Sequence, residues 1–232
     1  MAGVQREYNL DLRFVPGSTT LFVGVAGTGK SSLIFNILRY KHIAFANGAS
    51  LGMVIYCYKV WQDEYDRARD EGLVNYFHEG ALTNAQYVEL VTPYKQVGSV
   101  VIFDDCLDSL NEEMVKIITT SARHLNCHTF FLYQSLFPKN DHARAMSLNA
   151  KYLFVFKNVR DKKQFFYLAQ QLSPKKYQWL MEAYHHATRT PYSYFVIDLT
   201  QTCKESYRMR SNITPLEWPM RMYMPRSFAD SI

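Results

Sequence analysis

A short glycine-rich stretch near the start of the chain has the residue types and spacing that bind phosphate. It fits the pattern G-x-x-x-x-G-K-[ST] and comprises Gly24, Val25, Ala26, Gly27, Thr28, Gly29, Lys30 and Ser31. In this pattern the backbone turns tightly and directs its N–H groups at phosphate oxygens, while the lysine reaches the β- and γ-phosphates and the serine hydroxyl is a ligand of Mg²⁺. We therefore expect Lys30 and Ser31 to bind a nucleoside triphosphate and its magnesium ion.

The flanking residues support this interpretation over a glycine-rich turn without a ligand. Residues 20–23 form a short apolar run that ends at the first glycine, as a buried strand does. Residues 31–40 place four apolar side chains on one helical stripe. The triphosphate would therefore lie at the N-terminus of a helix, where unpaired N–H groups and the helix dipole favour anions.

A pair of aspartates, Asp104 and Asp105, follows a continuous apolar run at residues 99–103. Such a run is typical of a strand that is covered on both faces. A carboxylate at the end of a buried strand is the second metal contact of nucleotide-hydrolysing sites with this loop. We expect Asp104 to hold Mg²⁺ and Asp105 to orient or deprotonate the attacking water. The alternative is a pair of aspartates that caps the next helix.

Gln134 follows the next apolar strand, residues 129–133. If that strand lies between the strand before the glycine-rich loop and the strand before Asp104, Gln134 reaches the γ-phosphate. An amide there could sense the phosphate or hold the attacking water. A glutamine on the surface at a strand end is the alternative.

Two arginines are candidates for a group that stabilises charge on the transferred phosphoryl from a neighbouring subunit. Arg123 comes just before the strand that leads to Gln134, and Arg144 precedes Asn149 by five residues. For each arginine taken alone, an ordinary surface position is the alternative.

The elements that must position these side chains alternate between strand and helix along the chain. This alternation predicts an α/β fold with a mostly parallel central sheet flanked by helices, the fold of a P-loop NTPase. We expect one domain over residues 1–199. Residues 200–232 carry three prolines among aromatic and arginine residues, and we expect them to form an irregular C-terminal tail.

The positive charge is concentrated in one part of the chain. Residues 139–189 carry 10 Lys and Arg against 3 Asp and Glu, a balance of +7, whereas the whole chain carries +5. This asymmetry indicates a polyanionic partner such as nucleic acid, although a solvated basic face is the plainer alternative. No run of apolar residues has the length of a membrane span. The four cysteines lack C-x-x-C spacing, which predicts reduced thiols in an intracellular protein.

An ordered set of motifs resembles the poxvirus-type genome-packaging ATPases of the FtsK–HerA superfamily. The set is GVAGTGKSS at 24–32, VVIFDD at 100–105, ARHLNCHTFFLYQS at 122–135, and the segment from Arg144 through Asn149 to YLFVFK at 152–157. It covers about residues 19–160. The Arg-His pair, the strand and Gln-Ser are its most discriminating part.

This resemblance implies a RecA-like ASCE core, a homo-oligomeric ring and packaging of double-stranded DNA into a preformed capsid by ATP hydrolysis. It implies that Ser32 joins the nucleotide-binding loop, that Asp104 and Asp105 serve Mg²⁺ and water, and that Gln134 senses the γ-phosphate. Arg123 or Arg144 would act across the subunit boundary. A viral capsid or portal component would be a partner. The protein would lie in the cytoplasm or nucleus of an infected cell, with association with the virion as a further expectation.

Three other functions share part of this pattern. An AAA+ or helicase ATPase usually has Asn in place of Gln after the strand, and it has a helical lid. A nucleoside or nucleotide kinase would have no use for the paired aspartates or the basic segment. A scaffold that binds nucleotide without hydrolysis would not need Asp105. The paired aspartates, Gln134 and the basic segment together favour a DNA motor.

Overall fold

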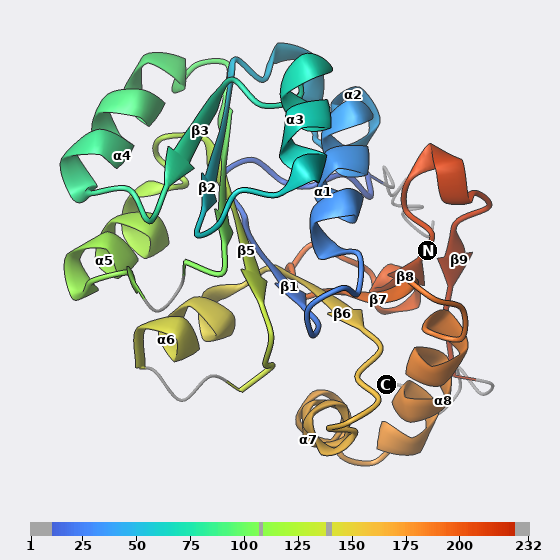
Figure 1. Ribbon diagram of the computed structural model, residues 1–232. Helices are drawn as coiled ribbons and strands as arrows, with labels where there is room; N and C mark the ends of the chain where they lie inside the picture. Colours follow the sequence, from blue (N-terminus) through green and yellow to red (C-terminus); the bar gives the residue numbers. More distant parts are fainter. Residues whose placement is uncertain (1–10, 107–108, 138–140, 226–232) are drawn as a thin grey trace, which may run out of the picture.

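The computed structural model describes residues 11–106, 109–137 and 141–225. A nine-stranded sheet runs through them with the order β3-β2-β4-β5-β1-β6-β7-β8-β9 (Figure 1). The strands are β1 Thr19–Val23, β2 Met53–Tyr58, β3 Tyr76–Glu79, β4 Ser99–Asp104, β5 Cys127–Tyr133, β6 Tyr152–Phe156, β7 Tyr194–Asp198, β8 Met209–Ser211 and β9 Arg221–Met222. Pairing is parallel from β3 to β6 and antiparallel from β6 to β9. The predicted α/β class with a mostly parallel sheet is therefore confirmed.

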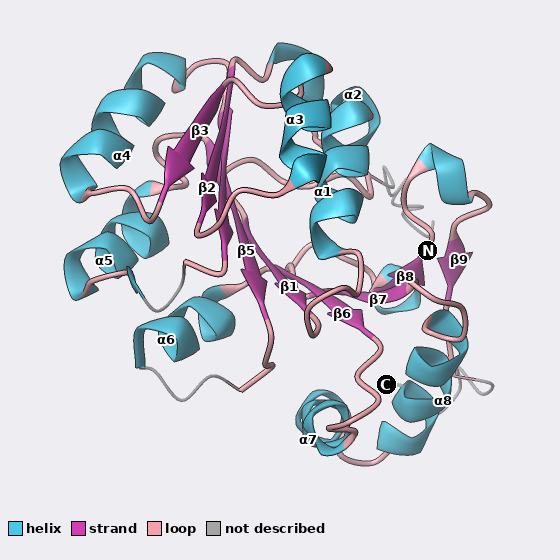
Figure 2. Ribbon diagram, in the orientation of Figure 1, coloured by secondary structure: helices cyan, strands magenta, loops and turns pink. Residues whose placement is uncertain are grey.

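Helices cover both faces of this sheet (Figure 2). They are α1 Lys30–Arg39, α2 Lys41–Ala44, α3 Asp63–Asp70, α4 Asn84–Val91, α5 Glu112–Ser121, α6 Asp141–Asn149, α7 Lys163–Leu172 and α8 Tyr177–Ala187. Side chains of α1 and α3 pack with one face of the sheet, and those of α4 to α8 pack with the other. The central strands are buried on both sides because helices cover both faces, which explains their continuous apolar sequences. None of the described helices combines the length and the apolar character needed to cross a lipid bilayer.

The sheet order decides which strand ends lie next to the glycine-rich loop. The strand β5 lies between β1 and β4, as the argument for Gln134 requires. Because β1, β4 and β5 are parallel, their carboxyl ends meet at one edge of the sheet. The fold therefore brings the loop after β1 and the aspartates at the end of β4 to the same edge.

The segment after residue 199 is more regular than its sequence suggests. The short strands β8 and β9 extend the sheet beyond β7, so the expectation of a wholly irregular tail was wrong. The boundary between a domain and a tail at residue 199 stays a prediction. Residues 226–232 of the expected tail lie outside the described residues.

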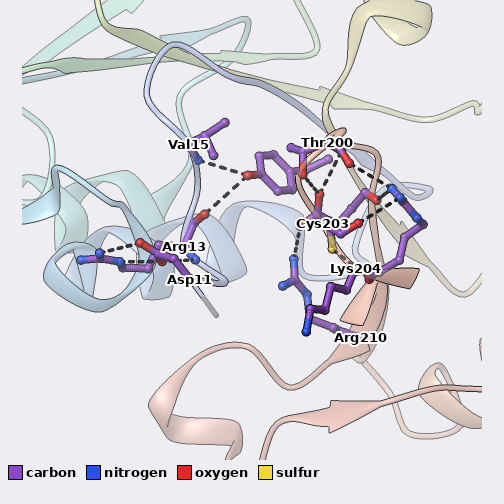
Figure 3. Close-up of polar contacts among 10 residues, drawn as sticks. Asp11, Arg13, Val15, Thr200, Cys203, Lys204 and Arg210 are labelled. Carbon is purple, nitrogen blue, oxygen red and sulfur yellow. Dashed lines mark hydrogen bonds and ion pairs between the residues drawn. The ribbon is translucent and has the colours of Figure 1, made fainter. Parts of the chain in front are cut away.

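A buried ion pair ties β8 to β7. Arg210 Nη2 lies 2.8 Å from Asp198 Oδ2, and both side chains are almost completely buried. The other carboxylate oxygen of Asp198 accepts hydrogen bonds from the backbone N–H and the hydroxyl of Thr200. Figure 3 labels Thr200 and Arg210. It also labels Val15, whose N–H donates a hydrogen bond to the Tyr152 hydroxyl. This ion pair fastens the C-terminal strands to the central sheet.

The substitution Asp198→Asn is expected to lower the free energy of unfolding by about 3 to 5 kcal/mol, because it leaves the Arg210 charge buried without its partner. Urea unfolding of the two proteins measures the difference. The double variant Asp198→Asn/Arg210→Met is the control, since it removes the unpaired charge and should recover part of the loss. Equal stability of wild type and the single variant would contradict the role given to this pair.

Candidate functional site

The backbone of the glycine-rich loop adopts conformations that glycine favours. Gly27 and Gly29 have φ angles of 75° and 91°, in the left-handed region that side chains disfavour. At Gly24 a Cβ would lie 2.6 Å from Thr28 Oγ1 and 2.8 Å from Phe156 Cβ, so a larger residue does not fit. Gly29 is the N-cap of α1 and provides no side-chain cap, which leaves the first N–H groups of this helix available to an anion.

Lys30 lies within the same loop and is held by it. Its ammonium donates to the carbonyl oxygens of Gly24 at 2.7 Å and Val25 at 3.2 Å. Burial lowers the pKa of Lys30, and the negative charges of Asp105 and Asp104 oppose that shift. The side chain is therefore fixed at the centre of the loop, close enough to the two aspartates to interact with their charges.

Asp104 lies at the end of β4, and one of its carboxylate oxygens accepts three hydrogen bonds. Its Oδ2 atom accepts hydrogen bonds from the hydroxyls of Ser31 at 3.2 Å, Tyr56 at 2.6 Å and Tyr65 at 3.0 Å. Burial raises the pKa of Asp104, and the two tyrosine hydroxyls act against that rise. The contact between Ser31 and Asp104 joins the glycine-rich loop directly to the aspartate strand.

The residues around this contact fit a magnesium ion. Mg²⁺ prefers oxygen ligands and binds through few protein groups while it keeps several waters. The Ser31 hydroxyl and the Asp104 carboxylate, 3.2 Å apart, provide two such oxygens. Within the described part of the chain, no three His, Cys, Asp or Glu side chains cluster as a metal site would require.

Asp105 adopts an unusual backbone conformation next to this centre. Its φ angle is 53°, in the left-handed region, and its side chain is exposed. Backbone strain of this kind is concentrated at functional sites, where the surrounding structure holds it. The carboxylates of both Asp104 and Asp105 line the same pocket.

The pocket at this edge has a volume of about 510 Å³, large enough for a nucleotide. Its lining includes all of the loop residues from Ala26 to Ser32 together with Asp104 and Asp105. The sequence did not predict seven further lining residues, which are Leu33, Asn36, Gln62, Glu64, Tyr192, Tyr194 and Glu217. One signal was available for Glu64, because it follows the carboxyl end of β2 at the same edge; its carboxylate accepts a hydrogen bond from the Ser32 hydroxyl at 3.0 Å.

Gln134 is close to the loop but does not line this pocket. The strand that leads to it ends at Tyr133, whose carbonyl accepts a hydrogen bond from the N–H of Gly24 at 3.0 Å. Gln134 instead lines a small cavity on the other side of Gly24, together with Gln164. The strand order that this role requires is present, and a role for Gln134 at the γ-phosphate stays a prediction.

The two candidate arginines lie away from the pocket, and among the described residues no arginine lines it. Arg123 precedes the amino end of β5 and packs its backbone against Gly17, so it lies at the opposite edge of the sheet from the loop. Arg144 is exposed near the start of α6. Neither arginine joins the pocket of its own chain.

Together, the loop between β1 and α1, the aspartate at the end of β4 and the parallel sheet between two helical layers define a P-loop NTPase fold. Solved structures of one protein share it: the genome packaging NTPase B204 from Sulfolobus turreted icosahedral virus 2. Its complex with ATP-gammaS is 13% identical over 90% of this chain and 97% of that chain, with a TM-score of 0.54. Its complex with AMP is 14% identical over 80% and 94%, with a TM-score of 0.51.

A likeness at this level of identity concerns the fold. No family model matches the sequence. A comparison with curated proteins gives no match either.

Proposed function

We propose that this protein is an ATP-hydrolysing motor that translocates double-stranded DNA and packages a viral genome into a preformed capsid. The proposal of ATP hydrolysis rests on the contact between Ser31 and Asp104 beside the buried Lys30. The shared fold with a viral genome packaging NTPase supports the packaging part. The motif order that resembles the FtsK–HerA ATPases supports it independently.

Each side chain of the loop has a distinct task in this proposal. Lys30 leaves the carbonyls of Gly24 and Val25 and donates to the β- and γ-phosphates of ATP. Ser31 and Asp104 would hold Mg²⁺, which neutralises charge that develops on the phosphates during transfer. Asp105 orients the attacking water from the rim of the same pocket. Positioning and charge stabilisation of this kind account for most of the catalysis in phosphoryl transfer.

A second subunit completes this site in our proposal. Lys30 is the one cationic side chain among the described residues that line the pocket. Phosphoryl transfer is accelerated strongly when an arginine is added in trans. Because Arg123 and Arg144 are exposed away from the pocket of their own chain, either could reach the pocket of a neighbour in a homo-oligomeric ring.

The DNA would contact basic side chains near the same edge of the sheet. The loop between β6 and α7 begins at the carboxyl end of β6 and carries the exposed residues Arg160 and Lys162, and the exposed Lys163 is the first residue of α7. A second candidate segment runs from residue 139 to residue 144, of which residues 139 and 140 lie outside the described residues. Contacts of this kind bind phosphate without regard to sequence and weaken as salt increases.

The double variant Lys162→Ala/Lys163→Ala is expected to weaken DNA binding and to reduce the slope of log K against log salt by about 2, since each phosphate contact contributes about 1. Fluorescence anisotropy with a labelled duplex at several salt concentrations measures both quantities. The variant Lys95→Ala, which removes an exposed lysine elsewhere, is the control. An unchanged slope would exclude this loop from the DNA contact.

The proposed function is tested by steady-state ATP hydrolysis with and without double-stranded DNA, for wild type and Asp105→Asn. DNA-stimulated hydrolysis that is lost in the variant supports the motor. Hydrolysis that DNA does not change, but that an added nucleoside raises, would replace the motor with a kinase. The capsid or portal partner and the location in an infected cell belong to the same proposal, and co-purification with virions tests them.

A further inference from the structure

The end of the pocket farthest from Asp104 is built by the segments that follow α8 and β8. Tyr192, Tyr194 and Glu217 line it, and all three come from the part of the chain beyond the motifs of the loop and the aspartates. In the sheet, β4 with Asp104 lies on one side of β1, whereas β7 and β8 lie on the other. The pocket therefore extends from a metal-binding end on the β4 side to a second end on the β7 side.

Tyr192 is unusual in its backbone and in its exposure. Its φ angle is 63°, a left-handed conformation that is rare for a bulky residue, and the residue is 71% exposed. Nevertheless the side chain lies against the loop, since its Cβ and Cδ1 atoms are each 3.3 Å from the position that a Cβ on Gly29 would take. A strained backbone that holds an aromatic ring at the edge of a binding loop suggests a ligand for that ring.

Glu217 faces the same end of the pocket and is anchored through one oxygen. Its Oε2 atom accepts hydrogen bonds from the Thr214 hydroxyl at 2.8 Å, from the Thr214 N–H at 3.3 Å, and from the hydroxyl of Tyr194. Among the described residues, none donates a hydrogen bond to Oε1. Tyr194 is itself fixed, because it is buried and its hydroxyl accepts from the N–H of Ile213. The carboxylate is therefore held in place through Oε2, while Oε1 can accept a hydrogen bond from a ligand.

We propose that Tyr192 and Glu217 bind the nucleoside part of the nucleotide, an inference that rests on the proposed function. When the γ-phosphate lies beside Asp104 and the phosphate chain follows the loop, the nucleoside must extend toward the β7 side. An aromatic face stacks on any nucleobase. A carboxylate oxygen accepts from a donor, such as the exocyclic amine of adenine, the N2 amine of guanine or a ribose hydroxyl. At the position of the adenine amine, guanine has the O6 acceptor, which a carboxylate disfavours.

The test compares the affinities of ADP, GDP, 2′-deoxyADP and inorganic pyrophosphate by isothermal titration calorimetry. Nucleoside diphosphates are used because the protein would hydrolyse triphosphates during the measurement. Pyrophosphate has no nucleoside, so its affinity measures binding to the glycine-rich loop alone. The variant Tyr192→Asn removes the ring and keeps a residue that tolerates the left-handed conformation. It should weaken ADP and GDP by about tenfold, the contribution of one aromatic stack, and leave pyrophosphate unchanged. Tyr167→Ala, which removes an exposed tyrosine of α7, is the matched control.

Glu217→Gln tests the carboxylate and distinguishes the two donors. Glutamine can still accept from Thr214 and Tyr194, but it presents an amide donor where Oε1 was. A fall in ADP affinity with GDP unchanged or tighter identifies the adenine amine. A parallel fall of ADP and GDP, with 2′-deoxyADP no longer distinguished from ADP, identifies a ribose hydroxyl.

Two results would overturn the inference. One is an ADP affinity that neither variant changes. The other is a loss of pyrophosphate affinity as large as the loss of ADP affinity, which would mean that Tyr192 only supports the loop. Failure of the proposed function looks different: wild type would bind neither ADP nor pyrophosphate, or Lys30→Ala would bind both as well as wild type does.

Discussion

Replacement of Lys30 with alanine is expected to reduce the rate of ATP hydrolysis by about a hundred- to a thousandfold, the usual cost of removing one donor to a developing negative charge. The reduction in rate should be closer to a thousandfold, because Lys30 is the one cation among the described residues that line the pocket. Single-turnover hydrolysis measures the chemical step directly, and Lys95→Ala is the control for a lysine removed elsewhere.

The stability of the Lys30→Ala variant must also be measured, because Lys30 stabilises the glycine-rich loop when no nucleotide is bound. Its ammonium satisfies the carbonyls of Gly24 and Val25, and the substitution leaves both without that donor. We expect a moderate loss of about 1 to 3 kcal/mol in the free energy of unfolding. A folded variant that hydrolyses ATP within tenfold of wild type would contradict the role of Lys30 at the phosphates.

The loop and the aspartates could be predicted because local sequence determines them. Residues 24–31 are contiguous, so their spacing alone fixes which backbone groups and side chains converge. Asp104 lies far away in sequence, but it follows an apolar run, and the carboxyl ends of parallel strands share one edge. The sheet order β4-β5-β1, on which the argument for Gln134 depends, is present, but Gln134 lines a different cavity from the loop and the aspartates.

The parts of the site that sequence reasoning missed come from burial and from very short elements. Tyr56 and Tyr65 look like ordinary core aromatics in the sequence, and only packing brings both hydroxyls to one oxygen of Asp104. The strands β8 and β9 contain three and two residues, too few for an alternating pattern to appear. The segment with Glu217 therefore looked irregular, although it forms one end of the pocket.

Asp104 and Asp198, the two buried aspartates among the described residues, should respond in opposite ways to the same substitution. Asp198 has a cationic partner, so loss of the Asp198 carboxylate leaves the Arg210 charge unpaired in the protein interior. Among the described residues, the hydrogen-bond donors to the Asp104 carboxylate are the hydroxyls of Ser31, Tyr56 and Tyr65, and burial raises its pKa. An acid whose pKa is higher in the folded state than in the unfolded state lowers stability wherever it is ionised. The folded protein therefore loses stability by carrying the Asp104 charge.

Asp104→Asn is accordingly expected to reduce magnesium-dependent hydrolysis by about a hundredfold or more while the free energy of unfolding stays equal or rises. The asparagine oxygen can still accept from Ser31, Tyr56 and Tyr65, but a neutral amide is a poor ligand for Mg²⁺. Any gain in stability should be present at neutral pH and should disappear as pH falls below the ordinary range of a carboxyl group, since Asp104 is then protonated in both states of the wild type.

Urea unfolding at neutral and acidic pH, combined with hydrolysis at several magnesium concentrations, separates these effects of Asp104→Asn. The variant Asp198→Asn provides the matched comparison, because it should lose stability and keep a complete metal site. If Asp104→Asn instead lost more than about 1 kcal/mol at neutral pH, Asp104 would stabilise the fold as an ordinary hydrogen-bonded residue. If it retained activity at saturating magnesium, the metal would be held elsewhere, and the contact between Ser31 and Asp104 would no longer support hydrolysis at this site.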